Sequence, residues 1–348
     1  MNTNTSLTEC ELIDLWARIF PRSPHQLNAL RQSDAELIVL PGSKSMRVAV
    51  TIDTISEEIT LGLYRNPFTI GWVAVMASLS DLAAVGARPL GIVVSIIIDT
   101  QRNRRFYEHL GHGIAVASNT SGVYVLGGDT NVGSTLSLSV CSLGLIPSDR
   151  IMTRKGCSIS DSLYISGRIG QGSALAISRF ENRHSHIFDE SFYRPVARLH
   201  ESNVVACFAS SCMDTSDGLL PTLHEITTIN EIGVIIEESI ESFMDAEAVT
   251  TARILGIPLW MMMAGPHGEF ELVFTIPREY EDLFVVEAGK TGWYPIRIGH
   301  ISDGNGIQIR NHEYHLRFDM QMMEEVMGSF NGSIPRIIES IKHCVIDS

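Results

Sequence analysis

The sequence lacks several patterns that would indicate a particular class of protein. Its six cysteines form neither a CxxC pair nor a zinc-ligand spacing, which favours reduced thiols over disulfides or structural zinc. The 12 histidines contain no HExxH arrangement. No apolar run reaches the roughly 20 residues that cross a membrane, and the N-terminus lacks the basic-then-apolar order of a signal peptide. These absences predict a cytoplasmic protein that does not contact membranes.

Basic residues are scarce as well. The 26 Lys and Arg against 40 Asp and Glu give a net charge of −14, which argues against a nucleic-acid partner because phosphate backbones require basic surface. Any phosphate bound by this chain would need a metal ion to offset the repulsion. Hydrophobic residues make up 45% of the 348 residues, so we expect a folded protein with two domains of ordinary size.

What the sequence does contain is organised around the stretch VYVLGGDT. Residues 123–126 predict a buried strand that stops at the pair Gly127 and Gly128, where the backbone is open to a ligand. Asp129 and Thr130 then supply oxygen atoms of the kind that bind Mg²⁺ and its phosphates. A simple turn between two strands is the alternative interpretation.

Both halves of the chain alternate helical and strand patterns. The first half predicts a sheet of about four strands with helices on one face. Its helices are expected at 6–20, 67–87 and 102–118, and its strands include a hairpin, AELIVL and RVAVTIDT, and the run 91–98. The second half repeats this pattern, with Trp260–Met263 as a buried strand and a terminal helix in IPRIIESIKH. The fold class is therefore α+β, in two halves that meet near residue 155.

Several aspartates interrupt apolar elements. Asp34 precedes a strand, Asp53 shares one strand face with Thr51, and Asp81 lies in a largely apolar helix. A carboxylate among apolar neighbours needs a metal, a cation or several hydrogen bonds. Few Lys or Arg lie nearby in the sequence, which favours a metal.

The turn MDTSDGL brings in two further carboxylates, Asp214 and Asp217, three residues apart. A helix follows, so Asp214 or Ser216 could cap it, and Asp217 alone could be a turn residue. Both interpretations stay open at this point.

Taken in order, TECELIDLWARIF, SDAELIVL, TIDT, LSDLAAVGARP, GGDT, TRKGC, DTSDGL and GEFELVFT make the chain resemble thiamine-monophosphate kinase. That enzyme belongs to the PurM-like superfamily, with aminoimidazole ribonucleotide synthetase, selenophosphate synthetase and the hydrogenase-maturation dehydratase. The resemblance implies an ATP- and Mg²⁺-binding dimerisation domain at 1–155 and a PurM-like α/β sandwich at 156–348. It further implies a homodimer in which the N-terminal sheets pair into a barrel.

The resemblance also implies roles for individual residues. Metal-binding positions fall on Asp34, Thr51, Asp53, Asp81, Asp129, Asp214 and Asp217. Nucleotide-binding positions fall on Gly127, Gly128, Asp129, Arg154 and Ser216, and the catalytic ones on Asp129, Asp217 and Arg154. Phosphoryl transfer from ATP needs mainly alignment and neutralisation of charge, which carboxylates with Mg²⁺ and an arginine supply. A surface arginine in a loop is the alternative role for Arg154.

Departures from the family pattern gather on the acceptor side. The family has two adjacent aspartates before the first strand, and Ser33 takes the place of one of them. Thr60 takes the place of a histidine that touches the substrate. Further replacements are Val73, Ser78, Val132 and the segment Pro266-His267-Gly268-Glu269, which leaves Glu269 as the substrate-side acid. We therefore expect Thr60 and Glu269 on the substrate side, and either an acceptor other than thiamine monophosphate or a weakened enzyme.

Three functions remain open from the sequence. The leading one is an ATP-dependent phosphotransferase acting on a small-molecule phosphate acceptor. A second is a cyclo-ligase or dehydratase that activates an amide or carbonyl oxygen by phosphorylation, and a third is a non-catalytic dimeric homologue. The selenophosphate and dehydratase branches themselves are disfavoured, since Cys10 lacks a glycine-rich setting and Cys344 is followed by VIDS.

Overall fold

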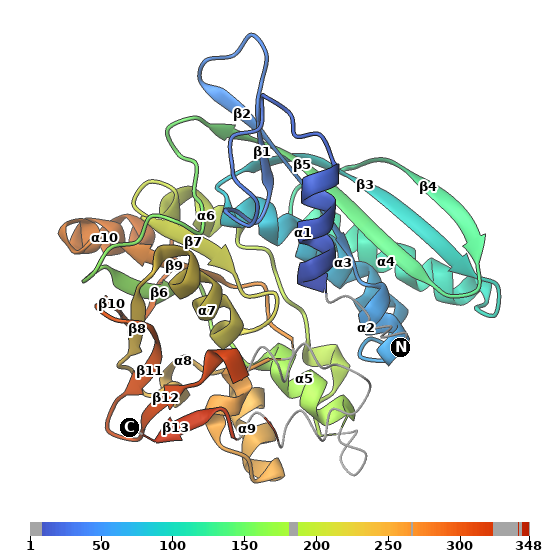
Figure 1. The fold of residues 1–348 in the computed structure, drawn as a ribbon. Coiled ribbons are helices and arrows are strands. Elements are labelled where there is room, and N and C mark those ends of the chain that lie inside the picture. Colours follow the sequence, from blue (N-terminus) through green and yellow to red (C-terminus); the bar gives the residue numbers. More distant parts are fainter. Residues whose placement is uncertain (1–8, 181–186, 266, 323–339, 341–342, 348) are drawn as a thin grey trace, which may run out of the picture.

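The chain folds around two β-sheets that lie side by side (Figure 1). A computed structural model describes all residues except 1–8, 181–186, 266, 323–339, 341–342 and 348. The first sheet has five strands in the order β1-β2-β5-β3-β4, and the second has eight in the order β13-β12-β11-β8-β10-β6-β9-β7. The five-stranded sheet ends at residue 147 and the eight-stranded sheet begins at residue 162, on either side of the boundary predicted near 155.

The N-terminal half follows the local signals of its sequence. Its strands are β1 (Glu36–Val39), β2 (Met46–Thr54), β3 (Arg88–Asp99), β4 (Val125–Gly133) and β5 (Ser137–Pro147), and its helices are α1 (Glu9–Ile19), α2 (Ser56–Leu61), α3 (Pro67–Ala84) and α4 (Arg104–Thr120). Helix α3 begins with Pro67 after the N-cap Asn66, whose side chain accepts from the Phe68 amide. Its residues are apolar on nearly every side, and nearly all of them are buried, which makes it the core of this half.

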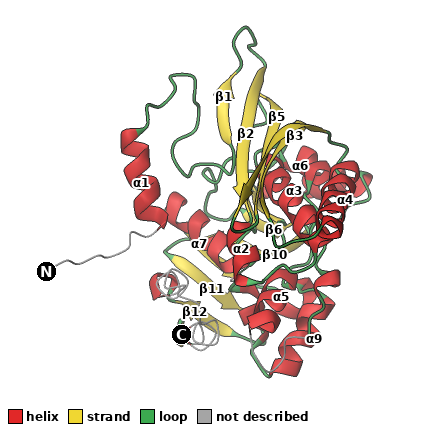
Figure 2. Cartoon of the chain, turned by 90° about the vertical axis from the view of Figure 1, so that its right-hand side faces the viewer, coloured by secondary structure: helices red, strands yellow, loops and turns green. Residues whose placement is uncertain are grey.

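Helices α3 and α4 cover only one face of the five-stranded sheet (Figure 2). Strand β5 alternates strictly between buried and half-buried residues, so one row faces α3 and the other faces outward. On the outward row, Ile52 of β2 is 65% exposed, and it lies in register with Cys141 and Val93 of the neighbouring strands. The outward face is therefore open and partly apolar.

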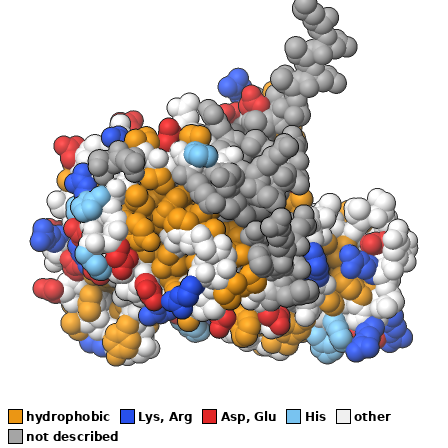
Figure 3. All heavy atoms as spheres, turned by 90° about the horizontal axis from the view of Figure 1, so that it is seen from below, with side chains coloured by type: hydrophobic (Ala, Val, Ile, Leu, Met, Phe, Trp, Pro, Cys, Tyr) orange, Lys and Arg blue, Asp and Glu red, His pale blue; other side chains and the backbone are white. Residues whose placement is uncertain are grey.

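The C-terminal half surrounds the eight-stranded sheet with short helices. Its strands are β6 (Ser162–Ile165), β7 (Ser211–Asp214), β8 (Gly233–Ile236), β9 (Leu272–Ile276), β10 (Ile296–Ser302), β11 (Gly306–Arg310), β12 (His315–Phe318) and β13 (Val345–Asp347). Its helices are α5 (Gln171–Phe180), α6 (Leu199–Val205), α7 (Leu219–Asn230), α8 (Ile240–Phe243), α9 (Ala246–Leu255) and α10 (Glu281–Lys290), with 3₁₀ turns η1 (Glu190–Phe192), η2 (Leu259–Met263) and η3 (Arg278–Tyr280). Seen from below, this half presents a broad group of hydrophobic side chains (Figure 3).

The two halves meet along α3, which contacts strand β7 and helix α6. The Trp72 indole donates to the Pro195 carbonyl over 2.7 Å, and the Ser80 hydroxyl donates to the Phe270 carbonyl over 3.2 Å. Among the described helices only α3 has the length and apolar composition to span a membrane, and 83% of it is buried inside the protein. It is the central helix that joins both sheets.

Three sequence expectations differ from the structure. The pair Gly127 and Gly128 lies inside strand β4 rather than at its end, and this strand is exposed because it forms an edge of the sheet. The first sheet has five strands rather than about four. Trp260–Met263 is buried as expected but forms the 3₁₀ turn η2, since Pro258 starts it and none of the described strands pairs with it. Most of the helix expected in IPRIIESIKH lies outside the described residues.

Candidate metal and nucleotide site

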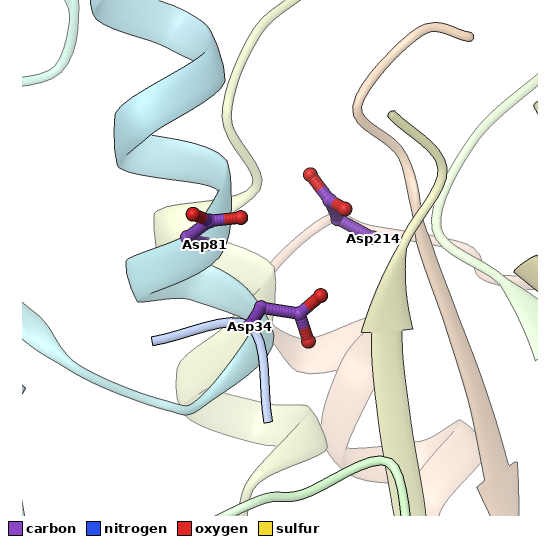
Figure 4. A group of neighbouring side chains, drawn as sticks. All are labelled: Asp34, Asp81 and Asp214. Carbon is purple, nitrogen blue, oxygen red and sulfur yellow. The ribbon is translucent and has the colours of Figure 1, made fainter. Parts of the chain in front are cut away.

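Three aspartates from distant parts of the chain converge where the two halves meet (Figure 4). Asp34 lies in the loop before β1, Asp81 in the last turn of α3, and Asp214 at the end of β7. One carboxylate oxygen from each lies within 4.8 Å of the other two. This spacing allows a single cation to contact all three carboxylates.

Strand β2 adds two of the predicted ligands to this acidic cluster. The Thr51 hydroxyl donates to Asp81 Oδ2 over 2.5 Å. Asp53 faces the same helix, because it is in register with the buried Val140 of β5, and it interacts with Asp81 and Ser78. Alternation along β2 puts Thr51 and Asp53 on one face, as the sequence predicted, and the structure shows that this face is the covered one.

Burial and mutual repulsion raise the pKa values in the cluster. Burial raises the pKa of Asp214 to about 8, and the charge of Asp34 adds to the shift. Asp81 has a pKa well above its usual value because of burial and the charges of Asp53, Asp214 and Asp34. Burial also raises the pKa of Asp53 to about 6. The cluster is therefore costly to charge by itself and would be stabilised by a cation.

Arg154 contributes positive charge on one side of the cluster. Its guanidinium donates to Asp34 Oδ1 over 2.9 Å and lies 3.6 Å from a carboxylate oxygen of Glu225. Burial raises the pKa of Asp34, and Arg154 opposes that shift. A single guanidinium cannot balance four ionised carboxylates, so full ionisation of the cluster calls for further cations.

The donor set fits Mg²⁺. Within the described residues, Asp34 Oδ2, Asp53 Oδ2 and Asp214 Oδ2 are buried and have no hydrogen-bond partner. Buried carboxylate oxygens rarely lack a hydrogen-bond partner. Mg²⁺ prefers oxygen ligands of this kind. These three atoms are where the cluster would receive its metal ions.

A fifth acid, Glu58 of α2, was not singled out in the sequence. Burial raises its pKa to about 7, and the charges of Glu57, Asp217 and Asp53 raise it further. Asp217 lies just before α7, so the charge of the loop after β7 acts on helix α2. In the sequence, Glu58 stands out only by lying one helical turn after the end of the predicted strand. An acid at such a position is ordinarily a solvent-exposed helix residue, so the sequence did not mark it.

Comparison with known proteins agrees with this geometry. The profile described as AIR synthase related protein, N-terminal domain, matches residues 32–146. These residues are therefore similar to that domain. The thiamine-monophosphate kinase of Archaeoglobus fulgidus is 27% identical over 305 residues, covering 87% of this chain and 92% of that protein.

Solved structures show the same fold over both halves. The structure of AaThiL complexed with AMPPCP and TMP has a TM-score of 0.72 at 21% identity. The match covers 91% of this chain and 99% of the AaThiL chain. Hydrogenase maturation protein HypE in complex with ATP has a TM-score of 0.64 at 17% identity, covering 82% and 87%. The predicted PurM-like resemblance is thereby confirmed.

The fold of the single chain does not bring every predicted residue to the cluster. Gly127, Gly128 and Asp129 lie on the edge strand β4, which β3 and β5 separate from β2. Asp129 is exposed, and its Oδ2 accepts from the Asn131 amide over 2.6 Å. It pairs with Ser95 of β3, which faces the open side of the sheet. Its metal and catalytic roles stay predictions, and the single chain does not place it with Asp53 and Asp81.

The two predicted substrate residues also lie away from the carboxylate oxygens. Thr60 is exposed at the end of α2, and its hydroxyl donates to the Ser56 carbonyl over 2.7 Å. Glu269 is buried and accepts from the amides of Gly170 and Gly172, 2.7 and 2.8 Å away, at the start of α5. Burial raises the pKa of Glu269 to about 8. Its carboxylate binds the N-terminus of α5, so its substrate role remains a prediction.

Proposed function

We propose that this chain is an ATP- and Mg²⁺-dependent phosphotransferase of the thiamine-monophosphate-kinase type. The observation that carries the proposal is the convergence of Asp34, Asp81 and Asp214, together with the buried carboxylate oxygens that lack a partner among the described residues. The names of the relatives, and the AMPPCP and TMP with which AaThiL is complexed, support the same activity.

In this proposal the residues of the cluster bind and orient rather than form bonds. Asp34, Asp53, Asp81 and Asp214 would hold Mg²⁺, with Thr51 fixing the orientation of Asp81. Bound Mg²⁺ supplies a template and a Lewis acid for the phosphates of the nucleotide. Arg154 would bind a phosphate oxygen through its planar guanidinium, held in place by Asp34. Asp217 and Ser216 would border the phosphates from the loop after β7.

We also propose a homodimer through the open face of the five-stranded sheet, which in the PurM-like arrangement closes the two sheets into a barrel. Ile52, Val93 and Ile97 form an apolar strip on that face, and Asp129 lies beside it. A second copy that covers this strip would bury the apolar side chains. It would also bring a partner's β4 toward the site, which would account for a functional Asp129 on an exposed strand.

The test is to incubate the purified protein with ATP and Mg²⁺, with and without thiamine monophosphate, and to measure ADP and the phosphorylated product. Thiamine diphosphate as the product supports the proposal with that acceptor. ADP together with free phosphate and a cyclised or dehydrated product would replace it with the ligase or dehydratase function. No ADP with any acceptor, and no Mg²⁺-dependent stabilisation by ATP, would leave the non-catalytic homologue.

A further inference from the structure

Helix α7 holds the loop that carries Arg154 through one side chain, that of its last residue, Asn230. Asn230 Nδ2 donates to the Arg154 carbonyl over 2.9 Å, and Asn230 Oδ1 accepts from the Gly156 amide over 2.8 Å. Nδ2 also donates to the Ile226 carbonyl, one turn back in α7, over 2.8 Å. The two loop contacts are to a backbone carbonyl and a backbone amide, so they require a donor and an acceptor side by side, which a side-chain amide supplies.

The loop 153–156 has little freedom to move away from α7. The Arg154 amide donates to the Gln32 carbonyl over 2.9 Å, in the loop before β1. Gly156 has a φ of +136°, in the region that favours glycine, and a Cβ there would lie 2.4 Å from the Ser210 carbonyl oxygen. The backbone of Arg154 is therefore fixed between the loop before β1 and the end of α7.

The side chain of Arg154 runs back along α7. Its guanidinium lies 3.6 Å from a carboxylate oxygen of Glu225, which is five residues before Asn230 and so about 7.5 Å nearer the start of the helix. The guanidinium also donates to Asp34 over 2.9 Å. Because α7 starts just after Asp217, anchoring the backbone at the end of α7 directs the guanidinium toward the acidic cluster and the loop after β7.

One nitrogen of this guanidinium is left for a ligand. Within the described residues, Arg154 Nε is buried and has no hydrogen-bond partner. Buried N–H donors rarely stay unpaired. A planar guanidinium binds phosphate oxygens in a defined orientation, so a small shift of its backbone would misalign it. The position of the Arg154 backbone therefore bears directly on how a phosphate is bound.

Resting on the proposed phosphotransferase function, we propose that Asn230 is a positioning residue for the nucleotide. It fixes the backbone of Arg154 so that the guanidinium meets a phosphate of ATP. Asn230 itself touches neither the nucleotide nor the acceptor, and it acts only through Arg154. Its loss therefore weakens the binding of ATP and leaves the contacts of the acceptor unchanged.

The experiment measures calorimetric binding of AMPPCP, a non-hydrolysable ATP analogue, in the presence of Mg²⁺. N230A deletes all three side-chain hydrogen bonds, so we expect its Kd to rise about five- to tenfold. N230D keeps the acceptor for the Gly156 amide but turns a carboxylate oxygen toward the Arg154 carbonyl, so it should weaken binding at least as much. In turnover, the KM for ATP should rise by the same factor, while the KM for thiamine monophosphate stays within about twofold.

The matched control is N203A, at an exposed asparagine of α6 whose Nδ2 donates to carbonyls of its own helix, and it should bind AMPPCP as the wild type does. A double-mutant cycle separates positioning from a general loss of structure. Arg154→Gln keeps a donor for Asp34 but loses the charge, so it should itself weaken binding. Adding N230A to R154Q should then change the Kd by less than about twofold, because its route to the nucleotide is gone.

Thermal unfolding checks that each variant is folded at the temperature of the binding measurement, and N230D provides the comparison if N230A is not. Wild-type binding of AMPPCP by the folded Asn230 variants overturns the inference, as does a full effect of N230A in the R154Q background. If R154Q weakens binding and N230A does not, the proposed function stands and the inference alone fails. A wild type that does not bind AMPPCP with Mg²⁺ overturns the proposed function, and the role of Asn230 with it.

Discussion

Replacing Asp214 with asparagine should stabilise the metal-free protein and remove its response to Mg²⁺. Asp214 is 2% exposed, and burial together with the charge of Asp34 raises its pKa to about 8, against 3.8 for an ordinary aspartate. The folded state therefore binds a proton that the unfolded state releases. This contribution to stability is full below pH 3.8 and is lost as the pH rises toward 8. Asparagine imitates the protonated form at every pH.

The magnitude follows from that shift. Each proton held by the folded state changes the free energy of unfolding by about 1.4 kcal/mol per pH unit. For a group with a folded pKa near 8, the loss between pH 6 and pH 8 is about 2 kcal/mol. At about 2–4 °C per kcal/mol, the melting temperature of the metal-free wild type should fall by several degrees over this range. Other groups that titrate between pH 6 and pH 8 change the stability of the wild type and of D214N by the same amount.

The assay is thermal unfolding at pH 6, 7 and 8, with a chelator or with Mg²⁺. Wild type should lose stability with rising pH in the chelator and regain it with Mg²⁺. D214N should show neither the loss attributable to this carboxylate nor the Mg²⁺ response, and D149N, at an exposed aspartate, should match the wild type. A pH profile shared by D214N and wild type, or an unchanged Mg²⁺ shift in D214N, refutes the reasoning.

Three further predictions concern other contacts. R154A leaves the buried Asp34 without its guanidinium partner, either as an unpaired charge or as a protonated acid, so we expect a loss of up to about 3–5 kcal/mol in urea unfolding. The KM for ATP should rise, and an unchanged KM contradicts the nucleotide role. In G268A the new Cβ would lie 1.5 Å from the Thr215 carbonyl oxygen, so the variant should unfold at lower urea, whereas G111A, in open space on α4, should be neutral or stabilising by up to about 1 kcal/mol. I52K puts a charge on the open face of the five-stranded sheet and should convert a dimer to a monomer, as measured by light scattering. The control I254K, on α9, should leave the dimer intact. If I52K remains a dimer, the interface lies elsewhere.

Local sequence patterns were sufficient for the elements that position the site. Pro67 at the first turn and an almost continuous apolar run specify α3, and strict alternation specifies β5. Asp81 was notable because a carboxylate inside such a helix needs a partner, and this argument depends on burial alone. Strand alternation likewise put Asp53 on the same face of β2 as Thr51.

Pairing and packing between distant segments decided what local patterns could not. Strand β4 has the composition of a buried run, yet it is exposed because it pairs on one side only, at the edge of the sheet. The residues around Glu269 also did not show that the amides at the start of α5, about a hundred residues earlier, donate to its carboxylate. Neither outcome follows from the residues that flank these positions.

By itself the sequence determined which carboxylates cannot be ordinary surface acids, because that depends on the apolar residues beside them. Only the tertiary structure decided that Asp34, Asp81 and Asp214 come together within one chain, since the distance between side chains is set by how two sheets pack along α3. It also decided that Glu58 is buried where the charges of Asp53 and Asp217 act on it. Charged groups far apart in the chain interact strongly only after folding has brought them together and removed the water between them.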